Sequence, residues 1–271
     1  MKTMQIKDLT LEIGRPKIAT PITAVTHEGI KEEVKELIKG PCDILEWRAD
    51  YYFGEFDNLE EMIESSDAHM KMIRILDDID YYAEGRPIIF SLTGEGDGGK
   101  VSISREHAFD LASLAAQSKL VDFVTLQLFD DDGALYINEI IKQIEEIHGF
   151  GARVILSYHE FDRMLSNDEV GNVTRTMRGL GADIPKVCCM AATIEEASQL
   201  QDVTKELTSG EQGPVIIIAM GEAGKVTRIT GGGYGSCITF AKGNAATAPG
   251  QIGADILAKY LDKYYENGGQ Q

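Results

Sequence analysis

The chain has 271 residues, of which 44 are acidic and 26 basic, giving a formal net charge of −18. This acidic excess argues against nucleic acid or an anionic membrane surface as a partner, because both require a basic footprint. The hydrophobic content of 43% and charged content of 26% are ordinary for a globular protein. No apolar run reaches the roughly 18 residues of a transmembrane helix.

Cysteine usage and the first residues of the chain favour a cytoplasmic protein. Cys42, Cys188, Cys189 and Cys237 show no C-x-x-C spacing, and the adjacent pair is poorly placed to form a disulfide. The opening residues, MKTMQIKDLTLEIG, alternate in polarity and lack the apolar core of a signal peptide. We therefore expect reduced thiols.

Short apolar runs alternate with longer amphipathic segments along the chain. The pattern predicts strands at 16–23, 42–50, 86–92, 121–129, 153–159, 181–190, 214–220 and 235–241. It predicts helices at 27–40, across 59–84, at 104–119, near 135–148, at 167–181, from a capping box of Thr193 and Glu196 to about 208, and at 249–265.

These elements make about eight strand–helix units with no Pro/Gly-rich linker between them, so we expect a single domain over 1–271. Apolar strands alternating with helices indicate a parallel sheet covered on both faces. Eight such units fit an α/β fold of the (β/α)₈ TIM-barrel type, and the first 15 residues could form a short hairpin that closes the barrel bottom. The alternative is an open doubly wound sheet.

One lysine lies within a strand that is otherwise apolar. In GADIPKVCCM (181–190), Lys186 lies nearer the middle of the strand than its end. A buried ammonium is costly unless it is paired or neutral, and a neutral amine can add to a carbonyl to form an imine. The alternative is a lysine whose stem lies on the protein while its ammonium reaches solvent.

Other polar residues fall at the carboxyl ends of predicted strands, where barrels carry their chemistry. His159 follows the apolar run of RVILSYH, and no second histidine stands near it at zinc-ligand spacing. Glu46 and Arg48 of LEWRAD are two residues apart and therefore face the same side. They form either a structural ion pair or a pair of hydrogen-bonding groups for a ligand.

A glycine-rich segment, GEGDGGKV (94–101), matches the spacing of a phosphate-binding loop. Val101 stands where that loop needs a Ser or Thr for Mg²⁺, and Glu95 and Asp97 would repel phosphate. A nucleotide site is therefore disfavoured, and we expect a mobile loop over the barrel mouth.

Together these segments resemble the type I 3-dehydroquinate dehydratase family of the shikimate pathway. The resemblance runs through almost the whole chain, in PKIATPI, LEWRADY, SYHEF, GADIPKVCCM, AMGEAGKVTRI, GSCITFA and TAPGQI. It implies a (β/α)₈ barrel, usually a homodimer, with no metal or organic cofactor. It also implies a lyase that converts 3-dehydroquinate, an anionic cyclic hydroxy-ketone, to 3-dehydroshikimate by syn elimination.

The resemblance implies three catalytic residues. Lys186, the lysine of D-I-P-K, is the one expected to form a Schiff base with the C3 ketone. His159, the histidine of S-x-H, is the expected general base and acid. Asp97 stands where the family has a glutamate that orients this histidine.

The resemblance implies five substrate-binding residues as well. Glu46 and Arg48 are expected to contact the ring hydroxyls, and Arg228, after a glycine-rich turn, to hold the carboxylate. Thr247 and Gln251 of the TAPGQ block are expected to contact substrate.

The chain departs from the family pattern at four positions near the expected site. Thr93 replaces an arginine, Asp97 a glutamate, and Thr125 and Gln127 two carboxylates. Asp97 is one methylene shorter than glutamate, so we expect its contact with His159 to need loop closure or a bridging water. These departures leave open a Schiff-base lyase or aldolase acting on a related cyclic hydroxy-ketone, or a catalytically weak ligand-binding paralogue.

Overall fold

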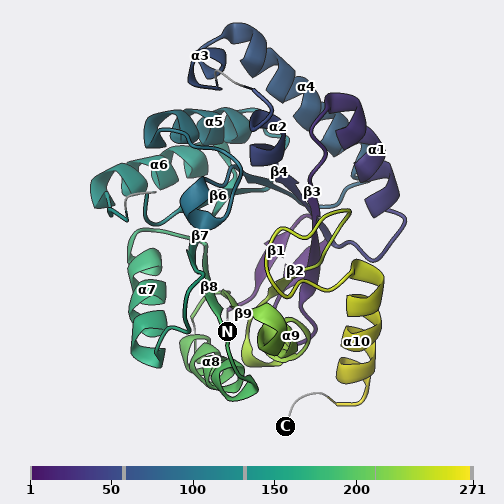
Figure 1. Ribbon diagram of the computed structural model, residues 1–271, viewed down its shortest axis with the longest axis vertical. Coiled ribbons are helices and arrows are strands. Elements are labelled where there is room, and N and C mark those ends of the chain that lie inside the picture. Colours follow the sequence, from purple (N-terminus) through teal and green to yellow (C-terminus); the bar gives the residue numbers. More distant parts are fainter. Residues whose placement is uncertain (1, 57–58, 131–132, 211, 269–271) are drawn as a thin grey trace.

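Eight parallel strands surround the centre of the molecule, with helices outside them (Figure 1). The computed structural model describes residues 2–56, 59–130, 133–210 and 212–268. The strand order is β10-β3-β4-β5-β6-β7-β8-β9. The strands are β3 (Lys17–Ile22), β4 (Ile44–Arg48), β5 (Ile88–Ser91), β6 (Phe123–Gln127), β7 (Arg153–Glu160), β8 (Ile184–Met190), β9 (Ile216–Met220) and β10 (Ile238–Phe240).

The two strands at the ends of this order, β9 and β10, approach each other. Val215, just before β9, forms a parallel bridge with Ser236, just before β10. The Cys237 amide also donates to the Val215 carbonyl at 2.9 Å. The sheet is therefore a nearly closed barrel, which confirms the TIM-barrel prediction, and the open doubly wound alternative is wrong.

The amino-terminal segment forms the predicted hairpin, from β1 (Met4–Ile6) and β2 (Leu9–Leu11), which pair antiparallel. Ile6 and Leu11 are buried in one apolar cluster with residues from the amino-terminal halves of the barrel strands, Ile44, Ile89, Phe123, Ile155, Ile184, Ile216 and Ile238. The hairpin therefore closes the bottom of the barrel, as predicted, and leaves the carboxyl ends of the strands open at the other end.

The helices that cover the strands match most of the predicted ranges. They are α1 (His27–Leu37), α4 (Ser66–Tyr82), α5 (Arg105–Gln117), α6 (Ile137–Phe150), α7 (Asn167–Gly179), α8 (Ile194–Leu207) and α10 (Ala254–Glu266). The predicted helical region 59–84 is divided into α3 (Leu59–Ile63) and α4. It divides because the Ser65 hydroxyl accepts a hydrogen bond from the Ala68 amide and so begins a new helix. A short α2 (Ala49–Phe53) directly follows β4 and was not predicted.

Helix α9 (Gly221–Thr230) lies between β9 and β10, where no helix was predicted. Its sequence, GEAGKVTRIT, is rich in glycine and β-branched residues, which are poor helix formers. Packing against β9 stabilises it, because the Thr227 hydroxyl accepts from the Ala219 amide at 3.0 Å. Gly224 lies so close that a Cβ there would meet the Ala219 oxygen at 2.3 Å. This tertiary contact outweighs local propensity. A short 3₁₀ helix, η2 (Gly231–Tyr234), follows.

Apolar packing between strands and helices forms the larger core. Trp47, fully buried on β4, meets Phe90 of β5 edge to face with ring centroids 5.7 Å apart. All four cysteines are free and buried. In the described part of the chain, no helix is long and apolar enough to cross a bilayer.

Candidate active site

A cavity of about 560 Å³, its mouth included, opens at the carboxyl ends of the strands. Every residue to which the sequence assigned a role lines this cavity: Glu46, Arg48, Asp97, His159, Lys186, Arg228, Thr247 and Gln251. The chain therefore brings together side chains that are up to 205 positions apart in the sequence, from Glu46 to Gln251. Whether each plays its expected role depends on its contacts.

Lys186 is the third residue of β8 and is only 8% exposed, so the alternative of an ammonium reaching solvent is wrong. Its Nζ lies 4.2 Å from the centroid of the Phe240 ring on β10. No carboxylate lies within ion-pair distance of it among the described residues. The amine is thus held inside the cavity by packing and a ring contact, with no acidic partner to fix it as an ammonium.

His159 is the second-last residue of β7 and points into the same cavity. Its Nδ1 lies 3.1 Å from Asp97 Oδ2, although the two are not aligned for a hydrogen bond. With the loop lying over the cavity, Asp97 therefore reaches the ring directly and needs no bridging water; its dependence on loop closure stays a prediction. The aspartate reaches because it lies in the short 3₁₀ helix η1 (Glu95–Asp97), which the loop folds toward β7.

Cys188 is a neighbour of His159 that the sequence analysis missed. It pairs with His159 in the β7–β8 register and lines the cavity two residues after Lys186. Burial alone would lower the pKa of His159, but Cys188 and Asp97 raise its pKa to about 9. The i, i+2 spacing from Lys186 was the available signal.

The glycine-rich loop is shaped by close contacts at the mouth. A Cβ at Gly99 would lie 1.7 Å from the Thr93 oxygen, so only glycine fits there. Farther along, the Lys100 amide donates to Asp50 Oδ2 at 3.2 Å. These contacts position η1, and with it Asp97, over the cavity.

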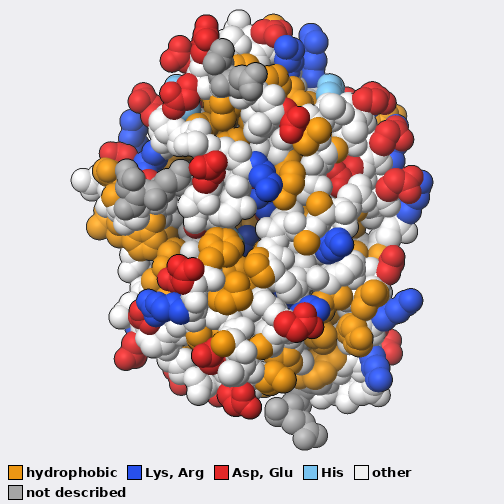
Figure 2. Space-filling model, viewed as in Figure 1, with side chains coloured by type: hydrophobic (Ala, Val, Ile, Leu, Met, Phe, Trp, Pro, Cys, Tyr) orange, Lys and Arg blue, Asp and Glu red, His pale blue; other side chains and the backbone are white. Residues whose placement is uncertain are grey.

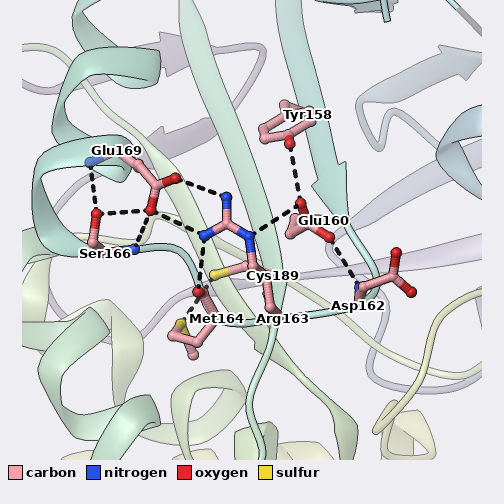
Figure 3. A network of polar contacts seen from close by, with 8 residues as sticks. All are labelled: Tyr158, Glu160, Asp162, Arg163, Met164, Ser166, Glu169 and Cys189. Atoms are coloured by element: carbon pink, nitrogen blue, oxygen red, sulfur yellow. Dashed lines mark hydrogen bonds and ion pairs between the residues drawn. The ribbon is translucent and has the colours of Figure 1, made fainter. Parts of the chain in front are cut away.

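Residues after His159 fix the end of β7 from outside the barrel (Figure 3). Tyr158 and Glu160 alternate with His159 along the strand and so point to the other face. Arg163 donates to Glu169 at 2.7 Å and lies 4.0 Å from Glu160, tying the strand end to the first turn of α7 (Figure 3). The turn that follows the histidine is therefore held in place.

Arg48 and Glu46 do not form the ion pair that one interpretation of LEWRAD predicted. Arg48 instead donates two 2.7 Å hydrogen bonds to the fully buried Asp50. Glu46 Oε1 accepts from the Ser91 hydroxyl at 2.9 Å. Asp50, which was missed, therefore holds Arg48 and, through Lys100, also anchors the glycine-rich loop.

Thr125 and Gln127, two of the positions expected to depart from the family pattern, lie on β6 and form neutral hydrogen bonds. Thr125 Oγ1 lies 2.9 Å from the Ser91 hydroxyl. Because Ser91 gives its single proton to Glu46, Thr125 donates to Ser91. Gln127 lines a neighbouring cavity and accepts from the Gly94 amide at 3.2 Å, so it touches the loop and not the substrate cavity.

Arg228 lies in the last turn of α9, and the glycine-containing segment before it, expected as a turn, forms the start of this helix. It is 2% exposed and donates to the carbonyls of Phe240 at 3.3 Å and Pro249 at 3.0 Å. Its Nε is buried and has no hydrogen-bond partner among the described residues. Burial lowers the pKa of Arg228 to about 10, so the guanidinium is still a cation at neutral pH and can accept an anionic ligand.

Thr247 and Gln251 form a compact turn between β10 and α10. The Thr247 amide donates to Gln251 Oε1 at 2.7 Å, and Gln251 Nε2 donates to Thr247 Oγ1 at 2.9 Å. The two side chains are paired and face the cavity together.

Charges are unevenly distributed on this side of the molecule. Figure 2 shows Lys and Arg side chains around the central hollow, whereas many acidic side chains lie toward the rim. This arrangement offers the local cations that an anionic ligand needs on an acidic protein. Among the described residues, no group of three or more His, Cys, Asp or Glu side chains could hold a metal ion.

The fold and the cavity are those of a barrel enzyme whose site is built at the carboxyl ends of its strands. The chain belongs to the type I 3-dehydroquinase family, whose model matches residues 18–267. The 3-dehydroquinate dehydratase of Alkaliphilus oremlandii is 34% identical over 255 residues, covering 94% of each chain. That of Listeria welshimeri is 29% identical over 262 residues, covering 97% of this chain and 98% of the relative.

Two solved structures are similar over 98% of both chains. The type I 3-dehydroquinate dehydratase of Clostridium difficile, solved with covalently modified comenic acid, gives a TM-score of 0.85 at 28% identity. The 3-dehydroquinate dehydratase of Geobacillus kaustophilus gives 0.87 at 25% identity.

Proposed function

We propose that this chain dehydrates 3-dehydroquinate through an imine on Lys186. The observation that carries the proposal is the meeting of Lys186, His159 and Arg228 in one cavity, with the lysine buried and free of any acidic partner among the described residues. The relative from Clostridium difficile was solved with covalently modified comenic acid, so that protein takes part in covalent chemistry with an acid ligand.

The reaction begins with addition of the neutral Lys186 amine to the C3 ketone and loss of water, giving an iminium ion. The iminium acidifies the C2–H bond because it takes up the developing negative charge. His159 removes the C2 proton and then delivers it to the departing C1 hydroxyl, which leaves as water by syn elimination. Water then hydrolyses the conjugated imine and frees the lysine.

Binding residues hold the substrate for these steps. Arg228 pairs with the carboxylate, since its Nε is buried and lacks an acceptor. Glu46 and Arg48 contact the ring hydroxyls, and the Thr247–Gln251 turn closes over the ring. Asp97 acts as a positioning residue that stabilises the imidazolium of His159.

One assay tests the proposal against its rivals. Formation of the conjugated product from dehydroquinate is followed in the ultraviolet, and the enzyme is then treated with borohydride in the presence of substrate. Product formation together with borohydride inactivation supports the proposal. A borohydride adduct that forms only with another ketone would identify a different Schiff-base lyase. If neither turnover nor an adduct is found, the chain is a ligand-binding paralogue.

A further inference from the structure

A second cavity adjoins the substrate cavity and shares Thr125 with it. It contains about 520 Å³ of empty space, mouth included, against about 560 Å³ for the substrate cavity. It lies among β5, β6 and α5, where β5 pairs with β6 and α5 packs against β6. Its walls are largely apolar, contributed by Phe90, Leu92, Ile103, Phe109, Leu126 and Phe129. A largely apolar cavity of about the same extent as the substrate cavity, with polar groups at its edge, is suited to a small amphiphilic molecule.

Arg105, the first residue of α5, is the cation of this cavity. Its guanidinium lies 5.6 Å from the Phe109 ring centroid and 5.0 Å from that of Tyr136. Among the described residues, its buried Nε has no hydrogen-bond acceptor, and no carboxylate forms an ion pair with the guanidinium. A guanidinium sheltered between two rings and lacking an acceptor favours binding of an anionic group.

Asp130, three residues after the end of β6, places a negative charge in the same cavity. Its Oδ1 accepts from the Ala134 amide at 2.7 Å. In the part of the chain that the structure describes, neither Lys nor Arg pairs with it, and Arg105 lies beyond the 4.0 Å of an ion pair. The cavity therefore presents separate positive and negative groups above an apolar interior.

We propose that this second cavity binds a free amino acid with an apolar or aromatic side chain. The carboxylate pairs with Arg105, the ammonium group pairs with Asp130, and the side chain lies against Phe90 and Phe129. A simple apolar acid would use Arg105 alone and supply no cation to Asp130.

A bound amino acid would affect the substrate cavity through two residues. Gln127 lines the second cavity and accepts from the Gly94 amide, where the loop carrying Asp97 begins. Thr125 lines both cavities and hydrogen-bonds Ser91, the partner of Glu46. Any change in substrate affinity caused by the amino acid must be matched by an equal effect of the substrate on amino-acid affinity.

Titration calorimetry on the full chain tests the proposal, with L-phenylalanine and L-leucine as probes. At least one should bind saturably, and the analogue without the amine (3-phenylpropionate or 4-methylpentanoate) or without the carboxylate (phenethylamine or isopentylamine) should bind at least about tenfold more weakly. Arg105→Gln should weaken binding at least about tenfold, whereas Arg74→Gln, an exposed arginine on α4, should leave it unchanged. Ala108→Phe, which fills the cavity, should abolish binding.

Three results would overturn the proposal. No saturable heat with either amino acid up to about 10 mM would leave the cavity without this ligand. Binding that survives Ala108→Phe would place the amino acid elsewhere. Equal binding of the analogue without the amine would assign the cavity to a simple apolar acid. Circular dichroism of each variant shows whether a loss of binding reflects the cavity or the fold.

Discussion

The two walls of the substrate cavity differ in how far they follow the family's sequence pattern. The wall of β7 and β8 carries His159 and Lys186 in the blocks that the family shares. On the β5–β6 side, neutral residues stand where the resemblance leads us to expect an arginine and two carboxylates: Thr93 and Thr125 line the cavity, and Gln127 lies beside it. The two residues proposed to make and break bonds thus stand in the expected blocks, while the residues proposed to surround the substrate differ from the expected pattern.

The changes on the β5–β6 wall are chemically consistent with one another. An arginine lost alone would leave its neighbouring carboxylates buried without a partner, which is costly. Here Thr125 instead hydrogen-bonds Ser91, and Gln127 holds the Gly94 amide. If the cation and the nearby anions are replaced together, no buried charge on this side is left without a partner. The substitutions therefore depend on one another.

Removing Lys186, on the β7–β8 wall, should have the largest effect on turnover. Lys186→Ala should lower turnover of dehydroquinate on the order of 10³-fold or more, because the imine can no longer form. Mass spectrometry after borohydride treatment with substrate should find the adduct on the peptide containing Lys186 and find none in the variant. Lys205→Ala, on the exposed face of α8, is the matched control and should keep both. An adduct on another lysine would move the chemistry away from β8.

Removing the buried arginine should have the next largest effect. Arg228→Ala should raise KM by a factor equivalent to a loss of binding free energy on the order of 2–5 kcal/mol, since the substrate carboxylate would lose its buried partner. Arg228→Lys keeps the charge and should recover part of the affinity. Melting temperatures are measured in parallel because Arg228 also donates to the Phe240 and Pro249 carbonyls. An unchanged KM in a folded alanine variant would place carboxylate recognition elsewhere.

The pH dependence of the reaction tests how Asp97, in the loop after β5, changes the pKa of His159. A pKa of about 9 keeps His159 protonated at neutral pH, and only the neutral ring can remove the C2 proton. The kcat/KM should therefore rise with pH through about 9. Asp97→Asn removes a neighbouring negative charge, lowers the pKa of His159, and should shift this rise to lower pH by about 1–3 units. Asp162→Asn, an exposed aspartate after β7, is the control. A rise at the same pH in Asp97→Asn would mean that Asp97 does not tune the ring.

Sequence patterns predicted the barrel strands and the residues that line the site, but not the side-chain contacts that hold those residues in place. Lys186 and His159 could be located because each belongs to an apolar strand followed by a turn. Helix α9 could not, since packing of Gly224 on Ala219 stabilises a segment of low helix propensity. The partner of Arg48 was missed for a similar reason. Both Glu46 and Asp50 lie two residues from Arg48, and only the turn into α2 places Asp50 against the guanidinium.

Restoring the family's cation on the altered wall should have the smallest effect and gives the sharpest test of substrate identity. Thr93 lines the cavity and is partly exposed. Thr93→Arg should lower KM for dehydroquinate by a factor equivalent to a gain in binding free energy on the order of 1 kcal/mol. The reason is that a guanidinium adds a charge-assisted hydrogen bond to an anionic substrate. Thr93→Gln adds a longer polar side chain without the charge and should leave KM nearly unchanged.

The outcome of Thr93→Arg depends on whether the neutral wall is a weakened version of the family's site or a site retuned for another molecule. In a weakened site the added arginine helps, and its benefit should grow when Gln127→Glu restores a carboxylate of the family pattern. In a retuned site the arginine crowds the Ser91–Thr125 pair and raises KM, with or without that carboxylate. A rise in KM in both variants, with the fold intact, would indicate that the native substrate is a cyclic hydroxy-ketone other than dehydroquinate, handled by the same Lys186 and His159.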